Sequence, residues 1–227
     1  MSTRLKNSPE FLEKFKDINI SVPQTLVVST EAFDSFIGEN NLRDVASEEY
    51  SDAEIIRLFT AAQMPEWLKL DLENYLHHAR YPLAVRSSSL LEDAQFQPFA
   101  GIYKTYMIPN NHPDLTKRVE HLILAIKLVY ASTYCKNARA YVKSTFHRTE
   151  DEKMGVVIQR LTGGTYGDYY YPSISGVAQS YNYYSIAYMK PEDGLAHVAL
   201  GLGKIVVEGG AAMRFSPKYP QFLPQFS

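Results

Sequence analysis

The chain has 227 residues and a formal net charge of −2, and its acidic and basic residues are interspersed. This distribution excludes the basic patch that binding to nucleic acid or to an anionic membrane requires. No apolar run approaches the roughly 20 residues that span a bilayer, and the N-terminus is polar rather than signal-like. We therefore expect no nucleic-acid partner and no membrane association.

A hydrophobic content of 45% is enough to fill the core of one large domain or of two small lobes. Cys135 is the single cysteine, so it has no partner for a disulfide or a thiolate metal site. This composition fits a reducing compartment, and we expect a cytoplasmic protein. Because Cys135 lies in a helical pattern, we interpret it as a core residue rather than a reactive thiol.

The first part of the chain begins with a helix, a strand and a second helix. Ser8-Pro9-Glu10 has the cap, first-turn proline and acidic residue of a short helix. Val22-Pro23 precedes an extended run over residues 25–28. A helix follows, for which we predict Thr30 as the cap and Gly38 as the end.

Two more helices are expected before residue 80. Ser51 and Glu54 form a capping box, in which the serine side chain and the glutamate satisfy free backbone amides at a helix start. Pro65-Glu66 begins the next helix, whose apolar residues recur at helical spacing as far as Leu76. No long linker separates the two.

A pair of strands follows. Leu83-Ala84-Val85 has the composition of a short buried strand, and a polar loop comes after it. Residues 102–108 alternate, with Tyr103, Thr105 and Met107 on one face and Tyr106 and Ile108 on the other. The two runs predict a hairpin with a long connection.

The most regular helix pattern starts at Asp114 and continues past Ala138 to Tyr141. Beyond it, short strand-like runs at residues 155–161, 176–180 and 198–202 alternate with turns rich in Gly, Pro and Tyr. The chain is therefore expected to be an α/β (α+β) protein with a helix-rich lobe over residues 1–150 and a strand-rich lobe over residues 151–227.

Tyrosines cluster between residues 166 and 188, where each ring offers apolar area and one hydroxyl. Two interpretations stay open: the rings pack on a twisted sheet, or they stack on a base or sugar.

An arginine followed by serines can hold a phosphate group. Arg86 comes where the strand over residues 83–85 ends, and Ser87, Ser88 and Ser89 follow it. A guanidinium offers a planar fork of donors, and the serines add hydroxyls and loop amides. A strand-end arginine can equally pair with a carboxylate, and Glu92 or Asp93 could serve as that partner.

The segment over residues 84–93, with 99–101 and 105–106, resembles the pattern "VRSS…ED…FAG…TY" of the phosphoenolpyruvate synthase and pyruvate phosphate dikinase family. Residues 22–33 resemble its "VPxGFVVTTEAF" segment, with Gln24 and Thr25 where proline and glycine are usual. Further matches to "VVVQ", "SGVAFT" and "GLGExVVxG" lie at residues 156–159, 175–178 and 201–209.

This resemblance implies an ATP-grasp-type fold, in which two α/β lobes clamp ATP. Arg86 would contact the phosphates, Gly101 would let backbone amides approach them, and Thr105 would add a hydroxyl. Gln159 falls where the family places a glutamine beside the nucleotide, near the adenine. A structural interpretation also stays open for each residue: Gly101 serves a turn, Thr105 is a strand residue, and Gln159 satisfies buried backbone groups. Glu92 and Asp93 are expected to order the loop.

Some family features have no counterpart in the sequence. A Gly-Gly-Lys-Gly-type segment, whose lysine holds phosphates, is replaced by residues 1–6, and no acidic "DIEW"-like strand follows Gly210. Lys204 replaces the glutamate of the "GLGE" segment, and residues 180–182 replace "TRNP". We therefore identify no ligands for the Mg²⁺ expected in an intact enzyme, and we assign none of the six histidines as a phosphorylated residue or a metal ligand.

The resemblance implies the ATP-binding domain of a longer phosphotransferase. This enzyme would pass a phosphoryl group from ATP to a histidine on another domain of the same chain, and then to pyruvate or another acceptor. Two alternatives remain: a degenerate nucleotide-sensing or interaction module, or the ATP domain of a related dikinase with a different acceptor, such as an antibiotic or a glucan.

Overall fold

The computed structural model describes residues 8–46, 50–89, 103–143, 153–186, 189–203, 205–206 and 212–221. The chain divides into two compact units, Met1–Leu161 and Thr162–Ser227. The expected boundary was earlier, between residues 150 and 151. The strand over residues 155–160 belongs to the first unit because it pairs with two strands of that unit.

The first unit contains most of the helices and a four-stranded sheet. The helices are α2 (Pro9–Lys14), α3 (Thr30–Glu39), α4 (Asp52–Ala61), α5 (Glu66–His78), α6 (Leu115–Ser132) and α7 (Lys136–Lys143), with a 3₁₀ turn η1 (Arg43–Ala46). The strands are β1 (Thr25–Val28), β2 (Leu83–Ser88), β3 (Thr105–Ile108) and β4 (Gly155–Arg160). The expected mixed α/β class, helix-rich first and strand-rich later, is confirmed.

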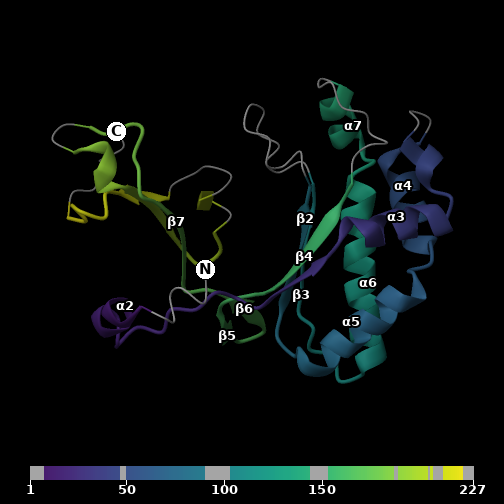
Figure 1. Cartoon of the computed structure of the whole chain (residues 1–227), viewed down its shortest axis with the longest axis horizontal. Coiled ribbons are helices and arrows are strands. Elements are labelled where there is room, and N and C mark those ends of the chain that lie inside the picture. The colour runs from purple at the N-terminus through teal and green to yellow at the C-terminus, as the bar shows by residue number, and fades with distance from the viewer. Residues whose placement is uncertain are drawn as a thin grey trace. The chain divides into compact units, whose positions relative to one another are not determined.

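The sheet has the order β1-β4-β2-β3, and each neighbouring pair is antiparallel. The predicted pairing of the strands before and after the long connection is confirmed as β2 with β3. In Figure 1, α3, α4, α5 and α6 lie on one side of this sheet. The sheet therefore has one face covered by these helices and one face that they leave uncovered.

Successive side chains of a strand point to opposite faces of the sheet, and the apolar ones lie on the face that the helices cover. Leu83 and Val85 of β2 and Val156 and Ile158 of β4 are fully buried there. Phe36 of α3 and Phe59 of α4 meet with their ring centroids 5.9 Å apart. Each such side chain stabilises the fold by roughly 1.5–3 kcal/mol through burial, so this layer is the core of the unit.

Two helix ends differ from the sequence prediction. Ser29, not Thr30, is the cap of α3, and Gly38 lies inside the helix. The helix ends at Glu39, and the side chain of the next residue, Asn40, donates a hydrogen bond to the carbonyl of Phe36 (2.8 Å). Asn41 then takes the left-handed conformation, with φ of 54°. Asparagine tolerates that region better than most residues.

The long helix predicted from Asp114 to Tyr141 is two helices. The first helix, α6, begins after Asp114, whose side chain accepts a hydrogen bond from the Thr116 amide. The chain tightens at Thr133 and Tyr134, and α7 starts afresh at Lys136. The break buries the Tyr134 ring, whose centroid lies 5.3 Å from that of Phe59. Cys135 is in this break, half-buried, and donates to the carbonyl of Ala131.

The turn from α5 into β2 is held by a buried arginine of α6. Arg118 is 2% exposed, and its Nη1 donates to the carbonyls of Leu76 (2.9 Å) and Ala79 (3.0 Å). Asn110 donates to Ala79 and to Tyr81, at 3.0 Å each. These bonds satisfy carbonyls at the end of α5 and fix the chain just before β2 begins.

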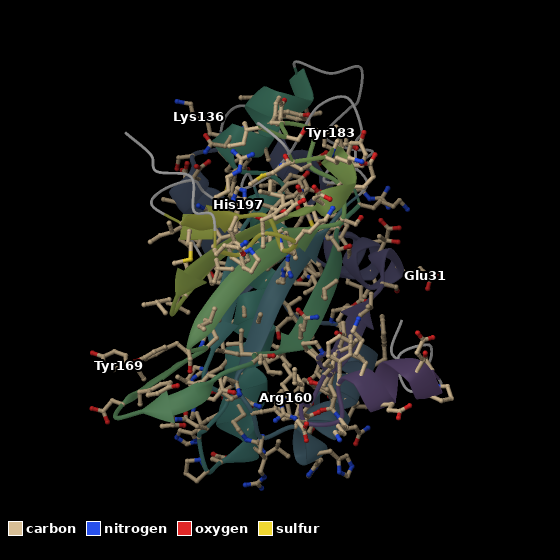
Figure 2. All side chains as sticks on the ribbon, turned by 90° about the vertical axis from the view of Figure 1, so that its left-hand side faces the viewer. Glu31, Lys136, Arg160, Tyr169, Tyr183 and His197 are labelled. Carbon is tan, nitrogen blue, oxygen red and sulfur yellow. The ribbon has the colours of Figure 1, made fainter. Side chains whose placement is uncertain are left out.

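The second unit is built from short strands. They form a β5-β6 hairpin (Gly164–Tyr166, Tyr169–Tyr171) and a sheet β7-β8-β9 (Ile174–Gln179, Leu195–Leu200, Met213–Phe215), and η3 (Pro191–Asp193) precedes β8. In the hairpin, Tyr166 stacks on Tyr171 with ring centroids 4.5 Å apart. Tyr169 and Tyr183, labelled in Figure 2, are 73% and 80% exposed. The cluster is thus partly packed and partly exposed.

Within the described part of the chain, no helix combines the length and the apolar character that a transmembrane helix needs.

Candidate functional site

Arg86 lies inside β2 rather than where the strand ends, because β2 continues to Ser88. It is opposite Thr105 of β3 on one side and Val157 of β4 on the other. Since directly opposed residues point to the same face of a sheet, Arg86 and Thr105 share a face. This face alternates with the one that carries Leu83 and Val85, so it is the face that α3 to α6 leave uncovered.

Gln159 lies on the same face as Arg86. It is two residues beyond Val157 on β4, and it is opposite Ala84 of β2 and Thr25 of β1. The uncovered face therefore has two rows of side chains across the sheet. One row is Val27, Val157, Arg86 and Thr105, and the next is Thr25, Gln159, Ala84 and Met107.

Much of the uncovered face is open to solvent, although Ala84 in its second row is 5% exposed. Val27 and Met107, at its two edges, are 63% and 62% exposed. Arg86 is exposed, and it makes no hydrogen bond or ion pair with another described residue. Arg160 on the neighbouring strand behaves differently, because its guanidinium lies 4.8 Å from the centroid of the Tyr81 ring. Of the two, Arg86 has its donors available for a ligand.

The three serines after Arg86 do not all lie on the uncovered face. Ser88 is two residues from Arg86, so it points to the same face and is exposed. Ser87 points to the opposite face, and Ser89, beyond the strand, is 7% exposed. Ser88 is the serine that a ligand on the uncovered face could reach.

Gly101, Glu92 and Asp93 lie outside the described residues. Of the four predicted site residues, the structure thus places Arg86, Thr105 and Gln159, and it brings these three onto one face.

The Gln159 side chain is held by a short chain of hydrogen bonds. Its Nε2 donates to the Thr25 hydroxyl (3.2 Å), and that hydroxyl donates to the carbonyl of Pro23 (3.1 Å). Sequence reasoning missed Thr25 because nothing local to residue 25 shows that β1 pairs with β4, some 130 residues later.

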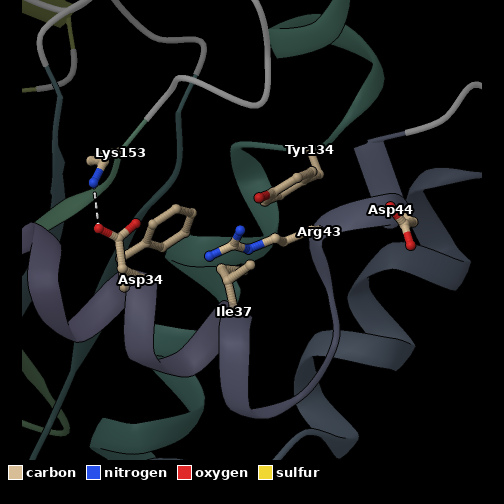
Figure 3. A pocket seen from close by; sticks show the side chains of 7 residues that line it. Asp34, Ile37, Arg43, Asp44, Tyr134 and Lys153 are labelled. Atoms are coloured by element: carbon tan, nitrogen blue, oxygen red, sulfur yellow. Dashed lines mark hydrogen bonds and ion pairs between the residues drawn. The ribbon is translucent and has the colours of Figure 1, made fainter.

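A separate pocket lies at the edge of the helical layer (Figure 3). Its volume is about 510 Å³, and it is lined by Phe33, Asp34, Ile37, Arg43, Asp44, Tyr134 and Lys153. Asp34 and Lys153 form an ion pair on one wall. The Arg43 guanidinium lies between this wall and Tyr134. None of the predicted site residues that the structure describes lines this pocket.

The described residues do not form a metal-binding site. No group of three or more His, Cys, Asp or Glu side chains there is placed to hold a metal ion. The described residues on the uncovered face offer hydroxyl, amide and guanidinium groups, which do not make the carboxylate set that Mg²⁺ usually takes from a protein. We therefore assign no Mg²⁺ ligand.

Residues 8–222 match the model of the pyruvate phosphate dikinase AMP/ATP-binding domain. The chain is also 27% identical over 201 residues to the uncharacterized phosphotransferase YvkC of Bacillus subtilis (strain 168). That match covers 87% of this chain and 21% of the relative, so the chain spans about a fifth of the relative's length. The family match extends over nearly all of the chain, and the chain therefore belongs to the AMP/ATP-binding domain family of pyruvate phosphate dikinase.

Proposed function

We propose that this chain binds ATP on the uncovered face of the β1-β4-β2-β3 sheet and acts as the nucleotide-binding part of a dikinase-family phosphotransferase. The observation that supports this site is the shared face of Arg86, Thr105 and Gln159. These residues come from three strands and are up to 73 positions apart in the sequence (159 − 86 = 73). The resemblance predicted a nucleotide contact for each of them independently of where they lie in the fold.

Arg86 and Thr105 form the phosphate end of the proposed site. An exposed guanidinium without a carboxylate partner in the described structure can give several charge-assisted hydrogen bonds to phosphate oxygens. Thr105 is directly opposite in the ladder, where Cβ atoms are about 5 Å apart, and it adds a hydroxyl. Gly101, which lies outside the described residues, is proposed to let backbone amides approach the same phosphates.

Gln159 forms the base end. It is diagonal to Arg86 across β2 and β4, a separation of about 7–8 Å between backbones. The long Arg86 side chain can point away from Gln159, so that its guanidinium lies farther from the carboxamide than the backbones are apart. A ribose fits between the two side chains. The Gln159 carboxamide offers both a hydrogen-bond donor and an acceptor, as the edge of a purine base requires.

In the proposed reaction, an imidazole nitrogen of a histidine on another domain bonds to a phosphorus atom of ATP. The bond from that phosphorus to the oxygen of the departing nucleotide breaks, and the phosphoryl group moves to the histidine. Arg86 would neutralise negative charge that moves between the phosphate oxygens, and the sheet residues would hold the nucleotide in line. Mg²⁺, if bound in the intact enzyme, would supply further charge neutralisation.

The remaining parts of the activity belong to the same proposal. The uncovered face of the first unit would be one wall of an ATP-grasp-type cleft. The phosphohistidine would pass its phosphoryl group to pyruvate or to another acceptor bound elsewhere in the enzyme. A cytoplasmic location fits this role.

Calorimetric titration of the chain with ATP tests the proposal. We expect measurable binding that Arg86→Gln weakens roughly 10- to 100-fold, the equivalent of about 1.5–3 kcal/mol for hydrogen bonds to a charged group. Arg57→Gln is the matched control, because Arg57 is exposed on α4 in the helical layer. Equal affinities for the wild-type protein and Arg86→Gln would refute the assigned site.

A further inference from the structure

The Gln159 carboxamide can be turned either way in principle, and its orientation decides which atoms face a ligand. A threonine hydroxyl has one proton and two acceptor lone pairs. The Thr25 hydroxyl gives its proton to the carbonyl of Pro23 (3.1 Å), so only its lone pairs remain for Gln159. The atom that meets it at 3.2 Å must therefore be a donor, the Nε2 amide nitrogen.

This bond leaves the rest of the carboxamide for a ligand. Gln159 Oε1 accepts no hydrogen bond from another described residue, and Nε2 keeps its second proton. An acceptor held in place suits the exocyclic amino group at position 6 of adenine. Guanine carries a carbonyl oxygen at that position, and two acceptors facing each other repel.

We propose that Thr25 is a positioning residue that sets the preference for adenine by fixing the Gln159 carboxamide. The inference rests on the proposed function, since it assumes that the base lies beside Gln159. Thr25 itself touches no nucleotide in this proposal. It acts through the side chain opposite it in the β1-β4 ladder.

The test compares affinities for ATP and GTP by calorimetry on the whole chain. Thr25→Val removes the hydroxyl with little change in shape, and valine is favourable in a strand, so the variant should fold. We expect it to lower the preference for ATP over GTP roughly three- to tenfold, which is the range of one hydrogen bond. Thr25→Ser restores the hydroxyl and should restore the preference.

Two further variants separate this role from a general effect. Thr60→Val removes a hydroxyl that bonds within α4, and it should leave the preference unchanged. In the Gln159→Ala background, where no carboxamide remains to be oriented, Thr25→Val should have no further effect on the preference.

A second readout does not depend on nucleotide. In the free protein, Thr25→Val should shift the NMR signals of the Gln159 side-chain amide, and Thr60→Val should not. Unchanged signals, or an unchanged ATP preference in Thr25→Val, would overturn the role of Thr25 and leave the proposed function intact. If the wild-type protein bound neither nucleotide, the proposed function would fail, and the assignment of base preference with it.

Discussion

Arg86 of β2 and Thr105 of β3 are directly opposite each other in an antiparallel ladder, on the face of the sheet that the helices α3 to α6 leave uncovered. The polypeptide between the two strands is long, yet the register brings a guanidinium and a hydroxyl side by side. This pair is the geometric basis of the proposed phosphate site.

The first prediction concerns phosphoryl transfer. In a protein that joins this chain to a phosphohistidine domain, Arg86→Ala should reduce labelling of that histidine from radioactive ATP by at least about 100-fold, because the variant would lose the proposed charge-assisted hydrogen bonds to phosphate. The same change at Arg57 should have no effect. Normal labelling of the histidine in Arg86→Ala would remove Arg86 from the reaction.

The second prediction concerns the buried guanidinium of Arg118. Arg118→Met keeps much of the apolar stem, but it removes the donor to the carbonyl of Leu76 and leaves Asn110 as the side-chain donor to the carbonyl of Ala79. Urea unfolding should show a loss of about 2–4 kcal/mol, since the lost bonds are buried and one partner is charged. Arg57→Met, at an exposed position, should change the free energy of unfolding by less than about 0.5 kcal/mol. A small effect at Arg118 would mean that water replaces its donors.

The third prediction concerns the capping box of α4. The Ser51 side chain accepts a hydrogen bond from the Glu54 amide (3.3 Å), and Glu54 accepts one from the Ser51 amide (2.8 Å). Ser51→Ala should cost about 1 kcal/mol at neutral pH, whereas Ser51→Thr should retain most of the stability. Urea unfolding at pH 7 measures both variants.

The capping box should also be sensitive to pH. Hydrogen bonds from the Ser51 side chain and then the Ser51 backbone lower the pKa of Glu54 from its ordinary value of 4.5. A carboxyl with a lowered pKa stabilises the fold above its unfolded-state pKa and loses this contribution as the pH falls through the folded-state pKa. The difference in stability between the wild-type protein and Ser51→Ala should therefore shrink below pH 4.5. A difference that stayed constant from pH 7 to pH 3 would contradict this coupling.

The fourth prediction concerns Cys135. Burial, and next the charge of Asp52, raise the pKa of its thiol from 9.0 to about 11. A shift of this size makes the reactive thiolate roughly 100-fold rarer at pH 8. Reaction with a disulfide reagent should be correspondingly slow in the folded protein and fast in guanidinium chloride, where the same thiol is exposed. Equal rates in the two conditions would show that the thiol is accessible in the folded state.

Local signals predicted much of the fold. The predicted Ser51–Glu54 box is present, because capping depends on residues within one turn of each other. The break between α6 and α7 could not be read in this way, since it arises from packing of Tyr134 against Phe33 and Phe59, far away in the sequence. Helical periodicity continues through that break and conceals it.

The candidate site was likewise predicted from the sequence only in part. The motif around Arg86 and the position of Gln159 were visible in the sequence. Their shared face was not, because it depends on the pairing of β2 with β4 across more than 60 residues. The extension of β2 to Ser88 follows from that same pairing, which supplies partners for the backbone of Ser87 and Ser88. The polar side chains there had suggested a loop.

The location of the base on the sheet is the central claim, and photolabelling with 8-azido-ATP tests it most directly. After illumination and proteolysis, mass spectrometry should find the label on peptides that contain Thr25 or Gln159, and excess ATP should suppress it. Label confined to peptides of the helical layer, such as α4 or α5, would contradict a nucleotide site on the uncovered face of the sheet.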